Sequence, residues 1–245
     1  MLNQFSRTQL LLGAEAMEKL KGARVAVFGI GGVGGYVCEG LVRSGVGAFD
    51  LVDDDKVCLT NLNRQIIATR KTVGKYKVDV MRERMLEINP DCDVRVHKCF
   101  YLPETAAEFN FSDYDYVVDA VDTVTAKVTL VLEAQKAGVP IISCMGAGNK
   151  LDPSCLRIAD ITKTSVCPLA RAIRVSCKKK GIRHMTVAYS LEPMHPPVQP
   201  IAEESGRRKD IPGSTAFVPG AMGLLIASHV VRTLMAGDEP ARPEG

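Results

Sequence analysis

Short apolar runs alternate with amphipathic segments through the first half of the chain. Each run is followed by glycine, proline or acidic residues, a pattern typical of buried parallel strands. The runs predict strands at 24–29, 49–52, 94–97, 116–119 and 141–144. Helical periodicity lies between them, at 34–44, at 75–87 and in the segment that ends at 136. This alternation predicts a Rossmann-like α/β fold, with a mostly parallel sheet and helices on both faces.

The second half breaks this alternation. Apolar runs at 155–159 and 186–189 predict strands without crossover helices of their own, and therefore an antiparallel extension of the sheet. A helix is expected between them at 168–180, because proline suits a first helical turn. The stretch 192–213 is rich in proline and charge, which predicts a mobile loop.

The segment 221–237 is the most apolar part of the chain. It is shorter than the roughly 20 residues that a membrane span needs, and it carries His229 and Arg232. We expect a helix buried in the fold or at a subunit interface, and no stable membrane insertion.

Composition narrows the classes of protein further. The formal net charge of +3 is too small to imply a polyanionic partner by itself. The first 20 residues lack the apolar stretch of a secretory signal, and none of the eight cysteines forms a Cys-x-x-Cys pair. These features predict a cytoplasmic protein with reduced thiols and argue against a structural zinc site.

A glycine-rich turn follows the first predicted strand and opens a helix. Gly29, Gly31, Gly32 and Gly34 would allow a phosphate chain to approach the backbone closely. Asp53 ends the second strand, where a carboxylate can accept hydrogen bonds from ribose hydroxyls. The motif predicts an adenine-nucleotide site. It does not distinguish NAD from ATP, and a glycine turn that binds nothing is the alternative.

Four polar residues further along favour ATP. Asn61, Arg64 and Lys77 follow the acidic strand end, and Asp122 follows a strand that should end at the same edge of the sheet. Phosphoryl or nucleotidyl transfer needs such cations to compensate charge on phosphate oxygens, and Asp122 could hold magnesium. Taken singly, Arg64 and Lys77 also suit a solvated surface, Asn61 a turn and Asp122 a helix cap.

Taken together, these motifs resemble the E1-like adenylating superfamily, which includes the ubiquitin-activating and ThiF/MoeB-type enzymes. The resemblance rests on GIGGVG at 29–34, DDD at 53–55, NLNRQ at 61–65, VGKYK at 73–77 and DAVD at 119–122. It implies ATP and Mg²⁺ as cofactors and a single adenylation domain over 1–245. Residues 1–150 would bind the nucleotide, and residues 151–245 would bind substrate and form a dimer.

The resemblance also implies roles for individual residues. Arg7 would reach into the active site of a neighbouring subunit, which implies a homodimer. The residues expected to act in catalysis are Arg7, Asn61, Arg64, Lys77 and Asp122, with Asp122 also at the metal. Those expected to contact the nucleotide are Gly29, Gly31, Gly32, Gly34, Asp53, Asp55 and Gln65.

Four stretches of the second half resemble one branch, the bacterial tRNA threonylcarbamoyladenosine dehydratases. They lie at 146–153, 160–171, 187–190 and 215–219. This branch implies adenylation of a threonylcarbamoyl carboxylate on tRNA, followed by ring closure without a catalytic cysteine. The resemblance does not decide whether a sulfur-relay protein is a partner. The rival functions are adenylation of the C-terminal glycine of a ubiquitin-like sulfur carrier, a non-catalytic ATP-binding scaffold and, more remotely, an NAD-dependent dehydrogenase.

A tRNA substrate requires basic surface, which the predicted helix at 168–180 offers. Arg171, Arg174, Lys178 and Lys179 are the candidate tRNA contacts, and Arg207–Lys209 could add to them. The alternative is a solvated basic face that caps the helix. Cys167, at the expected helix start, is more simply a packed thiol than a reactive one.

Overall fold

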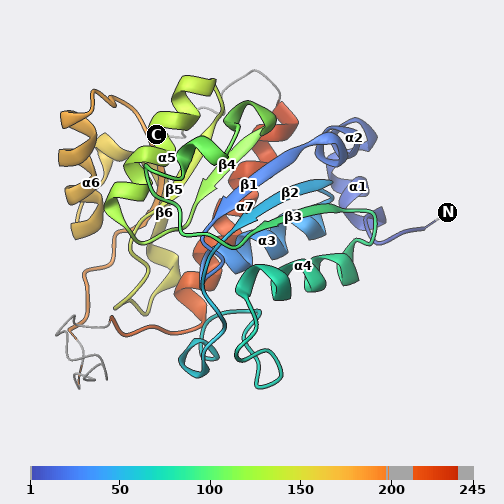
Figure 1. Ribbon diagram of the computed structural model, residues 1–245, viewed down its shortest axis with the longest axis horizontal. Helices are drawn as coiled ribbons and strands as arrows, with labels where there is room; N and C mark the ends of the chain where they lie inside the picture. Colours follow the sequence, from blue (N-terminus) through green and yellow to red (C-terminus); the bar gives the residue numbers. More distant parts are fainter. Residues whose placement is uncertain (1, 197, 199–211, 237–245) are drawn as a thin grey trace.

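The computed structural model describes residues 2–196, 198 and 212–236 (Figure 1). The basic residues 207–209 and most of the stretch 192–213 lie outside the described residues. Where that stretch is described, it is anchored rather than loose: Glu192 is 7% exposed and accepts hydrogen bonds from the backbone of Leu151 and Asp152. The expectation of a mobile loop is therefore wrong for its first residues.

A single seven-stranded sheet forms the centre of the protein, in the order β3-β2-β1-β4-β5-β7-β6. All neighbouring strands are parallel except β6, which runs antiparallel to β7. This arrangement confirms the predicted fold class. The strands are β1 Arg24–Phe28, β2 Ala48–Val52, β3 Asp93–His97, β4 Tyr116–Asp119, β5 Ile141–Cys144, β6 Leu156–Asp160 and β7 Thr186–Ser190.

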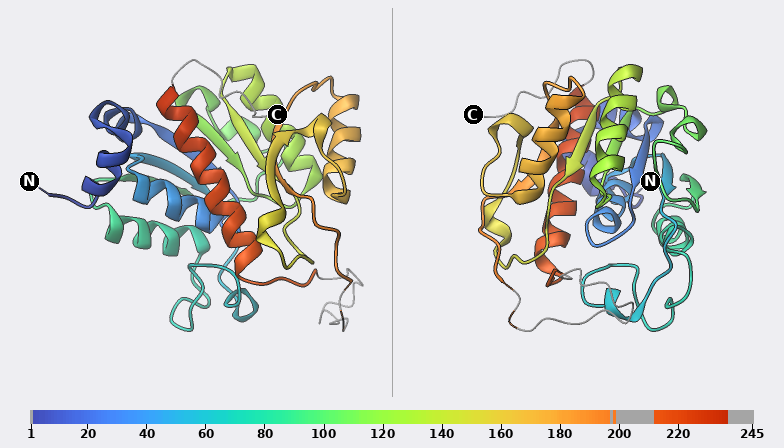
Figure 2. Two further views of the ribbon diagram at one scale, coloured as in Figure 1. Left: turned by 180° about the vertical axis from the view of Figure 1, so that it is seen from behind. Right: turned by 60° about the vertical axis from the view of Figure 1, so that its left-hand side comes forward.

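Helices cover both faces of the sheet (Figures 1 and 2). One face carries α3 Gly34–Ser44, α4 Lys77–Ile88 and α7 Phe217–Ala236, and the other carries α5 Val124–Ala137 and α6 Pro168–Lys179. The chain begins with α1 Ser6–Leu12 and α2 Ala14–Gly22, which the apolar pattern does not predict. Each face has its own apolar core, so the sheet is buried on both sides as parallel sheets usually are.

The last helix, α7, packs in the core beside α3. Val218, Met222, Ile226 and Val230 are fully buried, and a Cβ atom on Gly223 would stand 2.5 Å from the Val33 carbonyl oxygen. Only glycine permits so close an approach. At 20 residues α7 is longer than expected and could cross a membrane by length and composition, but buried core helices share both properties.

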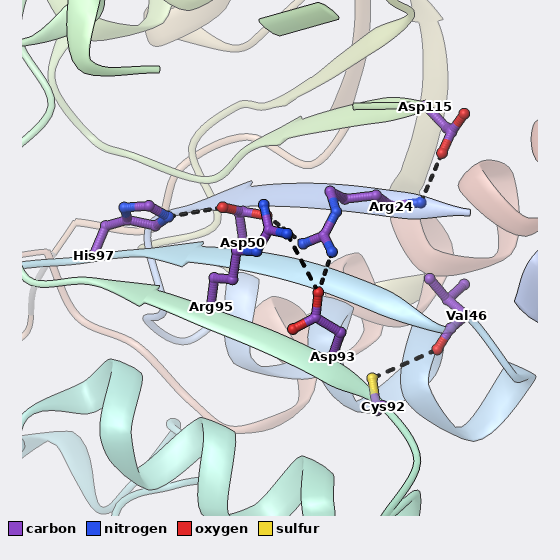
Figure 3. A network of polar contacts seen from close by, with 8 residues as sticks. All are labelled: Arg24, Val46, Asp50, Cys92, Asp93, Arg95, His97 and Asp115. Carbon is purple, nitrogen blue, oxygen red and sulfur yellow. Dashed lines mark hydrogen bonds and ion pairs between the residues drawn. The ribbon is translucent and has the colours of Figure 1, made fainter. Parts of the chain in front are cut away.

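Charged residues bridge the first three strands (Figure 3). Asp50 of β2 is 2% exposed and accepts hydrogen bonds from Arg24 of β1 at 2.8 Å and from His97 of β3 at 2.7 Å. Burial alone would raise the pKa of Asp50, but these hydrogen bonds and charges outweigh burial and hold the pKa below its ordinary value. The ion pairs therefore stabilise the folded sheet while Asp50 is ionised.

We expect Asp50→Asn to lower the free energy of unfolding at pH 7 by about 1–3 kcal/mol, because a buried hydrogen-bonded charge is lost. The stabilisation from Asp50 is complete above its unfolded pKa of about 3.9 and is lost as the pH falls through the lower folded pKa. Urea unfolding at pH 7 and pH 3 should show the difference between the two proteins shrinking at the lower pH. Exposed Asp91→Asn is the control, and a difference that stays constant with pH would contradict this account.

Candidate nucleotide-binding site

A cavity of about 610 Å³ opens where β1, β2 and β4 end and where the chain leaves β3. Its volume lies within the range of small-molecule sites. Ten of the residues predicted for the site line it: Gly29, Gly31, Gly32, Asp53, Asp55, Asn61, Arg64, Gln65, Lys77 and Asp122. The structure therefore brings these predicted residues together around one cavity, and their roles stay predictions.

Gly34 serves the cavity indirectly. It begins α3 and does not line the cavity, but a Cβ atom there would stand 1.8 Å from the carbonyl oxygen of Gly29. No side chain fits in that space. Gly34 therefore closes the turn that lets the backbone of Gly31 and Gly32 face the cavity.

Asp53 holds the glycine turn in place by hydrogen bonding to its backbone. Its carboxylate accepts hydrogen bonds from the backbone amides of Ile30 at 2.7 Å and Asp55 at 2.9 Å. Burial raises the pKa of Asp53, an effect that the charge of Lys77 and the two amides only partly oppose. A carboxylate offers about four lone-pair sites, so ribose hydroxyls can still bind here.

Lys77 is held by acids at the floor of the cavity. It is 6% exposed, and its Nζ lies 2.5 Å from Asp55 Oδ2 and 3.8 Å from Asp53 Oδ1. The sequence predicted that Lys77 contacts the ATP phosphates, but it did not reveal these two acidic partners. An ammonium group has three donors, so Lys77 can bind both the acids and a phosphate oxygen.

A short 3-10 turn, η1 Leu59–Asn61, presents the next polar group. Asn61 Oδ1 accepts a hydrogen bond from the amide of Cys58 at 3.1 Å, which leaves the Nδ2 donors for a ligand. Arg64 donates through Nη1 to the Thr60 carbonyl at 2.9 Å and to Asn63 Oδ1 at 3.0 Å. Gln65 Oε1 is buried without a hydrogen-bond partner among the described residues, which suits a site built for a polar ligand.

Asp122 lies just beyond β4 on the exposed rim of the cavity. Its Oδ1 accepts a 3.3 Å hydrogen bond from Thr123 Oγ1, and Thr123 rather than Asp122 occupies the N-cap position of α5. Across the cavity, the carboxylates of Asp53, Asp54 and Asp55 lie within 4.8 Å of one another. Carboxylate oxygens are the ligands that Mg²⁺ prefers, so both groups fit a magnesium nucleotide chemically.

A buried ion pair behind the rim escaped sequence analysis. Lys127 of α5 and Asp119 of β4 are both fully buried, with Nζ 3.1 Å from Asp119 Oδ1 and 2.7 Å from the Cys144 carbonyl oxygen. Asp119 Oδ1 also accepts from the amide of Val121, which lines the cavity. This pair joins β4, β5 and α5 and fixes the segment that carries Asp122.

The segment after β3 also lines the cavity and was missed. Cys99, Phe100 and Tyr101 face it, and Tyr101 Oη is buried without a hydrogen-bond partner among the described residues. Burial raises the pKa of Tyr101, so the hydroxyl stays neutral and can donate to a ligand. The rule that parallel strands end at one edge could have found this segment, because β3 neighbours β2.

Arg7 lies apart from the cavity of its own chain. It is exposed on α1, a helix that buries none of its residues. Arg7 could therefore act at an active site only if a second copy met α1. Its predicted role stays untested.

Cys167 and Cys144 are buried, and neither lines the nucleotide cavity. Cys167 precedes α6, is 4% exposed and makes no side-chain cap. Burial raises the pKa of Cys144, at the end of β5, to about 12. Both agree with the expected packed thiols.

The predicted tRNA contacts divide into two kinds. Arg171, Lys178 and Lys179 are exposed on α6. Arg174 is half-buried and donates through Nη1 to the Thr164 carbonyl at 2.8 Å, to its hydroxyl and more weakly to the Ile161 carbonyl. Arg174 therefore holds the turn before α6 in place, a structural task that its sequence position did not reveal.

Comparisons with known proteins agree with this geometry. The model of the ThiF family matches residues 5–244. A tRNA threonylcarbamoyladenosine dehydratase of Bacillus subtilis is 44% identical over 256 residues, covering 99% of this chain and 98% of the relative. The Escherichia coli enzyme of that name is 34% identical, over 95% of this chain and 94% of its own. Its crystal structures with AMP and with ATP superpose with TM-scores of 0.87 and 0.86, each covering 95% of this chain and 94% of the other.

Proposed function

This chain belongs to the ThiF family, and we propose that it is the ATP-dependent enzyme that dehydrates N6-threonylcarbamoyladenosine in tRNA to its cyclic form. The observation that carries the proposal is the cavity itself. It gathers Arg64, Lys77 and Asp122 around the glycine turn, in a chain that matches tRNA-modifying relatives over almost its whole length. The sulfur-carrier alternative is not favoured, because the near-full-length relatives named here bear the dehydratase name.

The reaction solves a leaving-group problem. The threonylcarbamoyl side chain ends in a carboxylate, and hydroxide leaves it slowly at neutral pH. Attack of a carboxylate oxygen on the α-phosphorus of ATP expels pyrophosphate and gives an acyl-adenylate. A ureido nitrogen then attacks the acyl carbon, loses its proton and expels AMP, which retains the carboxylate oxygen. The net change in the nucleoside is the loss of one water, as in other ATP-driven ligase and cyclase reactions.

The residues of the cavity divide this work between them. Backbone amides of Gly31 and Gly32 face the phosphates, and Asp53 accepts from the ribose. Arg64 and Lys77 compensate the negative charge that grows on the α-phosphate oxygens and on the leaving pyrophosphate. Ring closure is intramolecular, so correct positioning supplies much of its rate without a nucleophilic side chain.

Magnesium would bind at the rim. Asp122 would hold the ion, and the charge of Mg²⁺ would neutralise phosphate oxygens during nucleotidyl transfer. Asp53 is less suited to this task, because backbone amides and Lys77 already occupy much of its carboxylate.

A homodimer would complete the site through Arg7. Leu10 and Leu11, on the same helix, are 89% and 84% exposed, and a second copy could bury them. A cytoplasmic location fits the eight cysteines, all of which are free thiols. A sulfur-relay partner rests on the family resemblance alone.

One assay tests the proposed function. The protein is incubated with ATP, Mg²⁺ and tRNA bearing threonylcarbamoyladenosine, and the digested nucleosides are analysed by mass spectrometry. We expect a modified adenosine lighter by one water, together with AMP and pyrophosphate. ATP with a methylene bridge between its α- and β-phosphates is the control and should give no product. Unchanged nucleoside in the ATP reaction, with pyrophosphate exchange that requires a sulfur-carrier protein, would replace this function by the rival one.

A further inference from the structure

A second cavity, of about 600 Å³, lies between the last turns of α6, the turn after β6 and the segment 181–184. Its apolar floor is formed by Ile161, Cys177 and Ile182, which are 2%, 2% and 6% exposed. Its rim carries Arg174, Lys178 and Arg183. The cavity therefore has an apolar floor, which suits a flat apolar group, and a rim of cations, which suits an anionic group.

Planar polar groups stand at the same rim. Arg183 and His184 are both exposed and line the cavity, so the guanidinium and the imidazole are available for stacking. An acid also stands beside the rim, because Asp160 Oδ2 lies 3.3 Å from His184 Nδ1. Asp160 is already engaged, because it accepts from the amides of Thr162 at 2.8 Å and Met185 at 3.2 Å. Three cations, Arg174, Lys178 and Arg183, line the cavity against the negative charge of Asp160, so the rim carries a net positive charge.

The helix α6 leads away from this cavity. Segment 181–184 leads into β7, which is parallel to β5, so the second cavity lies at the opposite edge of the sheet from the ATP cavity. The last turns of α6 line the second cavity, so its first turn, at Pro168, lies at the far end of the helix from that cavity. A helix of this length spans about 18 Å. Exposed Arg171, Lys178 and Lys179 lie along the way.

We propose that the second cavity binds an unpaired nucleotide of the tRNA, with its base on the apolar floor and its phosphate against Lys178 and Arg183. The proposal rests on the proposed function and adds to it a second site of contact with the tRNA, outside the ATP cavity. Proteins read single-stranded RNA by stacking splayed bases on aromatic or guanidinium planes and by contacting phosphates with cations. The two cavities share no lining residue and lie at opposite ends of the parallel strands, so this nucleotide is not the reacting adenosine. An RNA arm would lie along the exposed basic residues of α6.

Two charge-matched double variants of the full-length protein test this site. Lys178→Ala with Arg183→Ala removes two cations from the rim, whereas Lys163→Ala with Lys180→Ala removes two exposed cations that do not line the cavity. Arg174 is left intact because it holds the turn at Thr164. Dissociation constants are measured for tRNA bearing threonylcarbamoyladenosine over a salt series. We expect the rim pair to weaken binding about tenfold more than the control pair and to lower the salt slope by about 1–2.

Abasic tRNAs then test for a bound base. With the unaltered protein, removing one base of the anticodon arm should weaken binding several-fold, as expected for a lost stacking contact. With the rim pair, the same abasic tRNA should bind as well as the complete tRNA. Equal losses in the two pairs, or abasic effects that persist in the rim pair, would overturn the inference. Failure of the unaltered protein to dehydrate the tRNA would instead overturn the proposed function.

Discussion

Replacing Arg64 by alanine is expected to lower kcat/KM for tRNA dehydration about a thousandfold while leaving the melting temperature unchanged. The catalytic loss follows from charge: a guanidinium aimed at phosphate oxygens stabilises the transition state more than the ground state. Stability should be preserved because, within the described part of the chain, Arg64 donates hydrogen bonds only to Thr60 and Asn63, its own neighbours in sequence. The measurements are steady-state kinetics on modified tRNA and thermal unfolding.

Two further variants sharpen this test. Arg64→Lys keeps the charge but not the planar fork, so it should recover part of the lost activity. Arg70→Ala removes an exposed arginine from the same loop that does not line the cavity, and should have little effect. Activity near the unaltered level in Arg64→Ala would remove Arg64 from the catalytic machinery.

Replacing Lys127 by methionine should have the largest effect on stability, a loss of about 3–5 kcal/mol in the free energy of unfolding. The substitution preserves side-chain length but leaves the Asp119 carboxylate fully buried without its cation. It also removes the donor to the Cys144 carbonyl oxygen. Urea unfolding at neutral pH measures the change.

The double variant Lys127→Met with Asp119→Asn separates the cost of an orphaned charge from the cost of lost packing. Asparagine can still accept from the Val121 amide but carries no charge, so the double variant should be clearly more stable than Lys127→Met alone. Lys136→Met, on the exposed side of the same helix, is the control. Additive losses in the double variant would show that the ion pair is not the source of the effect.

Much of the central sheet could be predicted from sequence, because buried parallel strands leave continuous apolar runs. The strand at 116–119 and the helix at 34–44 are found as predicted, and the helix ends at Gly45 with a φ of 97°. The helices before β1 were missed because they bury little: α2 buries only Ala16 and Leu20. The start of α7 was placed too late, at 221 instead of Phe217, although proline at 219 is tolerated in a first helical turn.

The candidate site, too, could be predicted only in part from the sequence. The polar residues converge because parallel strands end at one edge, which sequence order alone reveals. Other features of the site depend on side-chain directions that no local pattern encodes. They are the acidic partners of Lys77, the backbone hydrogen bonds of Asp53 and the hydrogen bonds by which Arg174 holds the turn at Thr164. Lys127 was missed for another reason: lysine is rarely buried, and Asp119 lies on a strand, so their spacing forms no helical pair.

The packing of α7 has a consequence for how the protein is made. Its first turn brings Pro219 Cβ within 3.4 Å of where a Cβ on Gly32 would stand, and Gly223 lies against Val33. The glycine turn is synthesised well before the helix that supports it. Until α7 has been synthesised, the α3 face of the sheet therefore stays exposed, and exposed apolar surface is prone to aggregation. ATP binding should mature only once α7 has been synthesised and docked.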